Sequence, residues 1–205
     1  MDPKWKHPFS AVVSGPSGSG KSVFILNFIE NLYDMCNSPF SDIYWHYGNT
    51  NPPRVNLPIK FHKGLPDLEE YYSNEPKLVI IDDLMREADF RVVDIFTKGC
   101  HHGNMSVFFT TQNLFHQGRG QRDISLNAHY IICFKNPRDK AQIRHLAHQV
   151  FNEKPLFIQE AYNDATSNSH GYLLLDMKQD TPDDYRFRTC IFPSDKLKFV
   201  YVPRK

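Results

Sequence analysis

A glycine-rich segment near the start of the chain has the residue types that hold a polyphosphate. It reads SGPSGSGKS over residues 14–22, and the pattern GxxxxGK(S/T) is matched by Gly15, Gly20, Lys21 and Ser22. Glycines allow successive backbone N–H groups to point into one concavity, and a following helix adds partial positive charge at its N-terminus. Lys21 would reach the β- and γ-phosphates of ATP, and the Ser22 hydroxyl would coordinate Mg²⁺.

The expected ATP contacts are Gly15, Pro16, Ser17, Gly18, Ser19, Gly20, Lys21 and Ser22. The alternative is a Gly/Ser linker that matches the pattern by chance.

Two adjacent carboxylates form the second candidate group. They follow an apolar run in KLVIIDDLM, residues 77–85, which is typical of a buried parallel strand. Asp82 would hold Mg²⁺, and Asp83 would orient and deprotonate the attacking water. Many motor ATPases have Glu at the second position, so the shorter Asp83 would need a closer approach. The alternative is an Asp pair that caps the next helix.

A third polar group ends another apolar strand. In NMSVFFTTQN, residues 104–113, the run from Val107 to Phe109 is followed by two threonines and Gln112. An amide both donates and accepts hydrogen bonds, so Gln112, at the tip of a strand expected beside the Asp strand, could hold the lytic water or contact the γ-phosphate. The alternative is a loop glutamine whose amide is bonded to the backbone.

Arginines in the following loop could act on the site of a neighbouring copy. The loop 114–126 contains Arg119 and Arg122, and a trans-acting arginine neutralises charge on the transferring phosphoryl group in ring-shaped ATPases. We take Arg122 as the first candidate and Arg119 as the second, with Arg138 and Arg144 as further options. A solvated surface arginine is the alternative for each. The predicted catalytic residues are therefore Lys21, Asp83, Gln112 and Arg122.

These groups require a sheet whose strands end at one edge. Apolar runs predict strands alternating with helical segments, which favours an α/β fold with a mostly parallel sheet. A TPDD turn between the last two runs predicts an antiparallel C-terminal addition. The expected strands are 9–13, 42–47, 59–62, 77–81, 107–109, 129–134, 171–177 and 185–192. The expected helices are 23–32, 67–72, 89–101, one starting at Asn136-Pro137, and 155–164.

Composition indicates one folded, soluble domain over residues 1–205. Hydrophobic residues make up 40% of the chain and charged residues 23%. The four cysteines are far apart and form no metal motif or disulfide framework, and no apolar run could span a membrane. Because the formal net charge is +1, a surface that handles DNA would have to be local or assembled from several copies.

The motifs together resemble a known family. The stretches SGPSGSGKS, LVIIDDLM, TKGCHHGNMSVFFTTQNLFHQG, ISLNAHYIICFKNPRD and HGYLLLD are similar to those of genome-packaging ATPases of the FtsK/HerA superfamily. Within it the similarity is closest to the poxvirus-like branch of Polinton/Maverick elements, adintoviruses and virophages, and it covers roughly residues 8 to 193. The phosphate loop is shared by many families, and the segments around Gln112 and the strand at 129–134 are more specific.

The resemblance implies a P-loop NTPase with a RecA-like core that assembles as a ring, a hexamer by analogy. Such a motor would drive double-stranded DNA into a preformed viral capsid, with Lys21, Ser22, Asp82, Asp83 and Gln112 in the roles given above. Its DNA contacts would be independent of sequence, with Lys98, Arg119 and Lys135 as candidates. It would act beside viral capsid proteins at assembly sites in the host cytoplasm or nucleus, with possible retention in the virion and no membrane partner.

Two other functions remain open at this point. A small P-loop phosphotransferase, such as a nucleotide kinase, would need an acceptor pocket and an arginine-rich lid, and no lid is recognisable. A nucleotide-gated assembly protein without hydrolysis would have no need of Asp82 and Asp83. Stimulation of phosphate release by DNA, rather than by a nucleoside monophosphate, separates the motor from the phosphotransferase.

Overall fold

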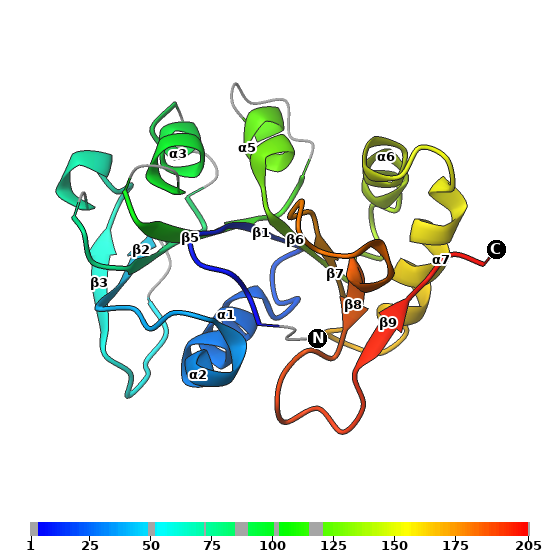
Figure 1. Cartoon of the computed structure of the whole chain (residues 1–205), viewed down its shortest axis with the longest axis horizontal. Coiled ribbons are helices and arrows are strands. Elements are labelled where there is room, and N and C mark those ends of the chain that lie inside the picture. The colour runs from blue at the N-terminus through cyan, green and yellow to red at the C-terminus, as the bar shows by residue number, and fades with distance from the viewer. Residues whose placement is uncertain are drawn as a thin grey trace.

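The computed structural model describes residues 4–48, 52–71, 73–84, 90–100, 103–114 and 121–204. Within these ranges the strands form one nine-stranded sheet in the order β3-β2-β4-β5-β1-β6-β7-β8-β9 (Figure 1). The strands are β1 Ser10–Ser14, β2 Asp42–Tyr47, β3 Ile59–Lys63, β4 Lys77–Asp82, β5 Met105–Thr111, β6 Tyr130–Phe134, β7 Tyr172–Asp176, β8 Phe187–Thr189 and β9 Phe199–Tyr201.

The sheet is parallel from β3 to β6 and antiparallel from there to β9. This confirms the predicted mostly parallel α/β sheet with antiparallel C-terminal strands. The central strands β4 and β5 are buried almost throughout, as expected when helices cover both faces of parallel strands. No helix of the described ranges is long and apolar enough to cross a membrane.

Helices lie on both faces of the sheet, and alternate strand residues supply the two cores (Figure 1). In β4, Leu78 and Ile80 pack toward α1, whereas Val79 and Ile81 pack toward α3, η2 and α5–α7. The helical elements are α1 Lys21–Glu30, α2 Leu32–Met35, η1 Leu68–Tyr71, α3 Phe90–Asp94, η2 Ile95–Gly99, α5 Gln121–Asn127, α6 Ala141–Val150, α7 Pro155–Ala165 and η3 Asp183–Tyr185.

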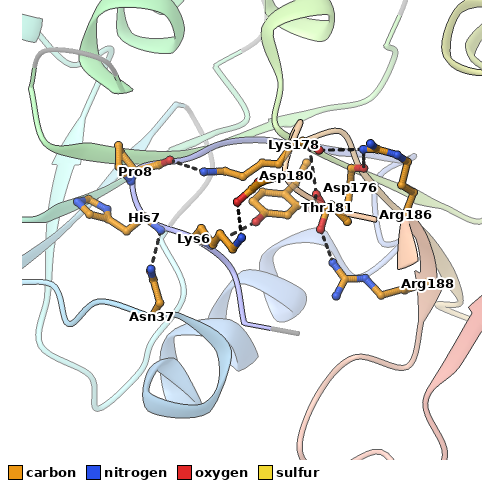
Figure 2. Close-up of polar contacts among 11 residues, drawn as sticks. Lys6, His7, Pro8, Asn37, Asp176, Lys178, Asp180, Thr181, Arg186 and Arg188 are labelled. Atoms are coloured by element: carbon orange, nitrogen blue, oxygen red, sulfur yellow. Dashed lines mark hydrogen bonds and ion pairs between the residues drawn. The ribbon is translucent and has the colours of Figure 1, made fainter. Parts of the chain in front are cut away.

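A polar network joins the N-terminal segment to the antiparallel strands (Figure 2). Lys6 forms an ion pair with Asp180, and the Lys178 ammonium donates to the carbonyl oxygen of Pro8 at 3.0 Å. Nearby, the Arg188 guanidinium donates to the buried Asp176 carboxylate, with 2.7 Å between Nη2 and Oδ2. Burial raises the pKa of Asp176, and the Arg188 charge opposes that rise. These contacts hold β7 and β8 against the start of the chain, beside β6.

Several predicted elements differ in detail. The predicted helix over 89–101 falls partly outside the described residues, and its described part consists of α3 followed by the π-helical turn η2. The predicted helix start at Asn136 is wrong, because Asn136 Oδ1 accepts the Arg138 N–H in a local turn and α6 begins at Ala141. Strand β9 was not predicted.

Candidate functional site

The carboxyl ends of three neighbouring parallel strands bring the predicted groups to one edge of the sheet. Strand β5 lies between β4 and β1, and Ser14 at the end of β1 is paired with Thr111 at the end of β5. The backbone N–H of Gly15 donates to the Thr111 carbonyl oxygen at 3.1 Å. The phosphate loop therefore starts beside the strand that leads to Gln112 and one strand away from the two acids. Ligands of open α/β sheets bind at such an edge.

The backbone of the phosphate loop has the shape that an anion requires. Gly18 and Gly20 have φ angles of 76° and 106°, in the region that favours glycine. A Cβ on Gly15 would lie 2.7 Å from both the Phe134 Cβ and the Ser19 Oγ, so this position has no room for a side chain. The buried Ser19 hydroxyl has no hydrogen-bond partner among the described residues. A crowded glycine cradle with an unpaired buried hydroxyl suits a phosphate group.

Lys21 is held by the loop that it follows. Its ammonium donates to the carbonyl oxygens of Gly15 at 2.8 Å and of Pro16 at 3.1 Å. Burial lowers the pKa of Lys21, and the charges of Asp82 and Asp83 act in the opposite direction. A polyphosphate beside this half-buried ammonium would supply the negative charge that favours its protonated form.

Hydroxyl groups from two elements converge on Asp82. The Ser22 hydroxyl at the start of α1 donates to Asp82 Oδ2 at 3.1 Å, and the Thr110 hydroxyl of β5 donates to Asp82 Oδ1 at 2.7 Å. Among the described residues, no three His, Cys, Asp or Glu side chains form a metal-binding group. One carboxylate beside one hydroxyl instead fits Mg²⁺, which takes few protein oxygens and completes its shell with phosphate and water.

Asp83 occupies a conformation unusual for a residue with a side chain. Its φ angle is 55°, and its N–H donates to the Thr110 hydroxyl oxygen at 3.0 Å. A Cβ on Gly48, just after β2, would lie 2.9 Å from the Asp83 carbonyl oxygen, so the chain needs glycine there. The turn leaves the Asp83 side chain exposed while Asp82 is half-buried and bonded. The two acids thus have different surroundings.

Gln112 lies one residue beyond β5, and its side chain is exposed. No hydrogen bond joins its amide to another residue of the described ranges, in contrast to the backbone-bonded loop glutamine considered above. The amide is therefore available to a ligand at the same edge as Lys21 and Asp82.

The structure gives a partial placement of the arginine candidates. Arg119 lies outside the described residues, and for Arg122 only its position in α5 is described. Arg138 is exposed in the turn before α6, and Arg144 is exposed on α6 itself.

A cavity of about 740 Å³ opens beside the phosphate loop and extends over residues that the motifs did not indicate. Its far wall comes from the segment between α7 and β7 and from the segment after β8. His170 has a φ angle of 60°, and its Cδ2 lies 3.6 Å from the position of a Cβ on Gly20. The aromatic lining residues are Phe24, Phe134, Tyr172 and Phe192. A planar apolar group linked to phosphates in the loop would fit this cavity.

Two contributions to the site could not be found from sequence motifs. Thr110 precedes the more obvious Gln112, and its role depends on which strand lies beside β4. His170 is far from the loop in sequence, and although it opens the stretch HGYLLLD, that stretch assigned it no role; the close packing at Gly171, where a Cβ would lie 2.4 Å from the Ala165 carbonyl oxygen, is known only from the structure. Both roles follow from contacts between elements.

Comparison with solved structures finds viral packaging ATPases of the same fold. The genome packaging NTPase B204 from Sulfolobus turreted icosahedral virus 2, in complex with sulfate, superposes with a TM-score of 0.58 at 15% identity, covering 100% of this chain and 99% of that chain. Its complex with ATP-gammaS gives a TM-score of 0.58 at 14% identity, with 100% of both chains covered. The DNA-packaging ATPase from Sulfolobus turreted icosahedral virus gives 0.59 at 14% identity, again with 100% of both chains covered. No protein-family model and no curated protein matches the sequence.

Proposed function

We propose that this protein is an ATP-hydrolysing motor that translocates double-stranded DNA into a viral capsid. The observation that carries the proposal is the contact of Ser22 with Asp82 beside the phosphate loop, in a fold shared over its full length with viral packaging ATPases. The structural neighbours include complexes with ATP analogues, which supports ATP as the nucleotide. The similarity to the FtsK/HerA superfamily and its poxvirus-like branch, stated from the motifs, belongs to this proposal.

The loop and the adjoining cavity suit the two ends of ATP. Phosphates would lie against the backbone of residues 15–20 and against Lys21, whose ammonium would exchange its carbonyl partners for phosphate oxygens. The base would enter the cavity next to His170 and the aromatic side chains of the far wall. In this way both the phosphate charge and the planar base are recognised.

Each polar group at the edge of the sheet has a separate task in hydrolysis. Ser22 and Asp82 would hold Mg²⁺, which supplies charge neutralisation between the phosphates when bound. Thr110 keeps Asp82 oriented through its hydroxyl bond. Asp83 would accept a proton from the attacking water, and the free amide of Gln112 would orient that water.

We further propose a homo-oligomeric ring, a hexamer by analogy with the family, in which Arg122 reaches the nucleotide of a neighbouring copy. The partners would be duplex DNA, bound without sequence preference, and viral capsid proteins. The protein would then act at viral assembly sites in the host cytoplasm or nucleus, with no membrane partner.

The decisive experiment is steady-state ATP hydrolysis with and without linear duplex DNA, at low and high salt. We expect DNA to stimulate hydrolysis, the stimulation to fade as salt rises, and Lys21→Ala to abolish activity. Transfer of phosphate to a nucleoside monophosphate, with no response to DNA, would instead identify a phosphotransferase. Hydrolysis that is indifferent to DNA in the assembled protein would contradict the motor.

A further inference from the structure

The outward face of α6 has a stripe of basic side chains. Lys140, Arg144 and His148 are all exposed and are spaced four residues apart, so they lie one above another on a helix. Lys140 already has helical backbone angles at the N-terminal end of α6. At a rise of about 1.5 Å per residue, the stripe is about 12 Å long. Successive phosphates on one DNA strand are about 3.4 Å apart along the axis, so the stripe covers several of them.

The basic side chains of this stripe have no carboxylate paired with them in the described ranges, in contrast to several other exposed cations of the protein. Helix α6 contains no Asp or Glu, and no carboxylate in the described part of the chain forms an ion pair with Lys140, Arg144 or the adjacent Arg138. Elsewhere, Lys60 lies 2.6 Å from Asp42 and Lys98 lies 3.0 Å from Asp94. Lys98, a candidate DNA contact from the sequence, is thus already paired. A helix face with basic and no acidic residues is suited to an external polyanion.

The stripe is mechanically connected to the segment that follows Gln112. The Gln142 side chain in the first turn of α6 accepts the Leu114 N–H at 3.1 Å. Its amide group also donates to Asp139 Oδ2 at 2.8 Å. These two bonds place the start of α6 beside Leu114, two residues after Gln112.

We propose that the stripe of Lys140, Arg144 and His148, with Arg138 at its end, contacts the phosphate backbone of duplex DNA. This inference rests on the proposed function and names the surface that performs it. It would let a chain whose formal net charge is only +1 bind DNA locally, because Lys140 and Arg144 lie on a helix that contains no acidic residue. The bond between Gln142 and Leu114 gives this surface a direct link to the edge where ATP is hydrolysed.

The test compares the double variant Lys140→Gln/Arg144→Gln with Lys196→Gln/Lys198→Gln, which removes two exposed cations from another surface. Binding of a fluorescent linear duplex is measured by anisotropy over a series of salt concentrations. The α6 variant should bind roughly tenfold more weakly at moderate salt, with a log–log salt slope smaller by about two. The control should keep the wild-type affinity to within about twofold.

The single variants Lys140→Gln and Arg144→Gln should each lower the log–log salt slope by about one. Thermal melting should show that all variants remain folded.

Three outcomes would overturn the inference. Equal affinity and slope for the α6 variant and the control would remove α6 from the DNA contact while leaving the proposed motor intact. If Lys140→Gln/Arg144→Gln sediments as a smaller species than wild type, the stripe binds an acidic surface of a second copy of the chain instead of DNA. Wild-type protein that hydrolyses ATP but binds no duplex would contradict both the stripe and the proposed function.

Discussion

At the scale of single residues, Thr110 is the side chain that fixes both acids. Its hydroxyl donates to Asp82 and accepts from the Asp83 N–H, and it is almost fully buried. Thr110→Val keeps the shape and removes both bonds, so Asp82 loses an orienting partner and the Asp83 N–H loses its acceptor. We expect the Mg²⁺ concentration for half-maximal ATP hydrolysis to rise about tenfold or more, as for other groups that orient metal ligands.

The matched control for Thr110 is Thr166→Val. This variant also removes a buried hydroxyl, which donates to the Tyr162 carbonyl oxygen at 2.7 Å at the C-terminal end of α7. It should lower stability without moving the Mg²⁺ dependence. If Thr110→Val lowers the melting temperature but leaves the Mg²⁺ titration unchanged, Thr110 is only a packing residue.

His170 gives a second prediction at this scale. Its exposed side chain lies beside Gly20 at the wall of the cavity, so His170→Ala should weaken contact with the base. We expect the KM for ATP to rise about fivefold, or about 1 kcal/mol, the lower end of stacking energies. Turnover at saturating ATP should change little, because no phosphate contact is removed. His62→Ala, at an exposed histidine of β3, is the control, and an equal KM in both variants would exclude His170 from the site.

Single residues differ in how far they can be found from sequence. Lys21 and Ser22 belong to a contiguous pattern, and each needs only its own loop and helix to be placed. Asp82 was found because it ends an unbroken apolar strand. Thr110 was not assigned a role of its own, since its bond to Asp82 depends on the register between β5 and β4, which no motif specifies.

At the scale of elements, the buried imidazole of His46 ties β2 to the segments around it. Nδ1 lies 2.9 Å from the Gly64 carbonyl oxygen, and Nε2 lies 2.8 Å from the Tyr71 hydroxyl. The neutral ring satisfies both contacts when Nδ1 donates and Nε2 accepts. Burial lowers the pKa of His46 to about 4, with the carbonyl of Gly64 opposing the shift and His62 adding to it.

This shift predicts a loss of stability in acid. The unfolded chain protonates His46 near its ordinary pKa of about 6.5, so between that value and the folded pKa of about 4 it binds more protons than the folded chain. The contribution of His46 is full above pH 6.5 and declines as the pH falls toward 4. Thermal melting against pH should show this decline in wild type and a flatter profile in His46→Gln, with a lower melting temperature at neutral pH. An unchanged slope in His46→Gln would refute the assignment.

Elements with regular patterns were predictable, and those defined by distant contacts were not. The apolar runs of β1, β2, β4 and β6 are strongly patterned, and α7 has Pro155 at its first turn. Strand β9 is mostly exposed and short, and it forms only because β8 offers an edge to pair with. The first turn of the predicted helix at Asn136 is lost because its side chain and that of Asp139 bond to nearby backbone N–H groups.

At the scale of the whole molecule, the order of strands decides which motifs meet. A mostly parallel sheet with the Gln112 strand beside the Asp82 strand was expected from the sequence, as observed, but no residue pattern placed β1 on the other side of β5. That order places Gln112 between the phosphate loop and the acids, and it places α6 after β6 on the other side of β1. In the proposed ring, one further group of the active site would come from another copy of the chain. The Arg122 guanidinium of a neighbour would supply positive charge beside the transferring phosphoryl group.

A mixture of two inactive variants tests that arrangement. Lys21→Ala should abolish turnover by removing the phosphate contact of its own site, and Arg122→Ala should leave ATP binding intact but abolish most turnover. In a ring mixed from equal amounts, about a quarter of the interfaces pair an intact loop with a neighbour that still has Arg122. Hydrolysis should therefore recover to about a quarter of the wild-type rate, because the arginine acts across the interface. Activity no greater than the sum of the separate variants, in rings shown to have mixed, would place Arg122 outside the neighbour's site.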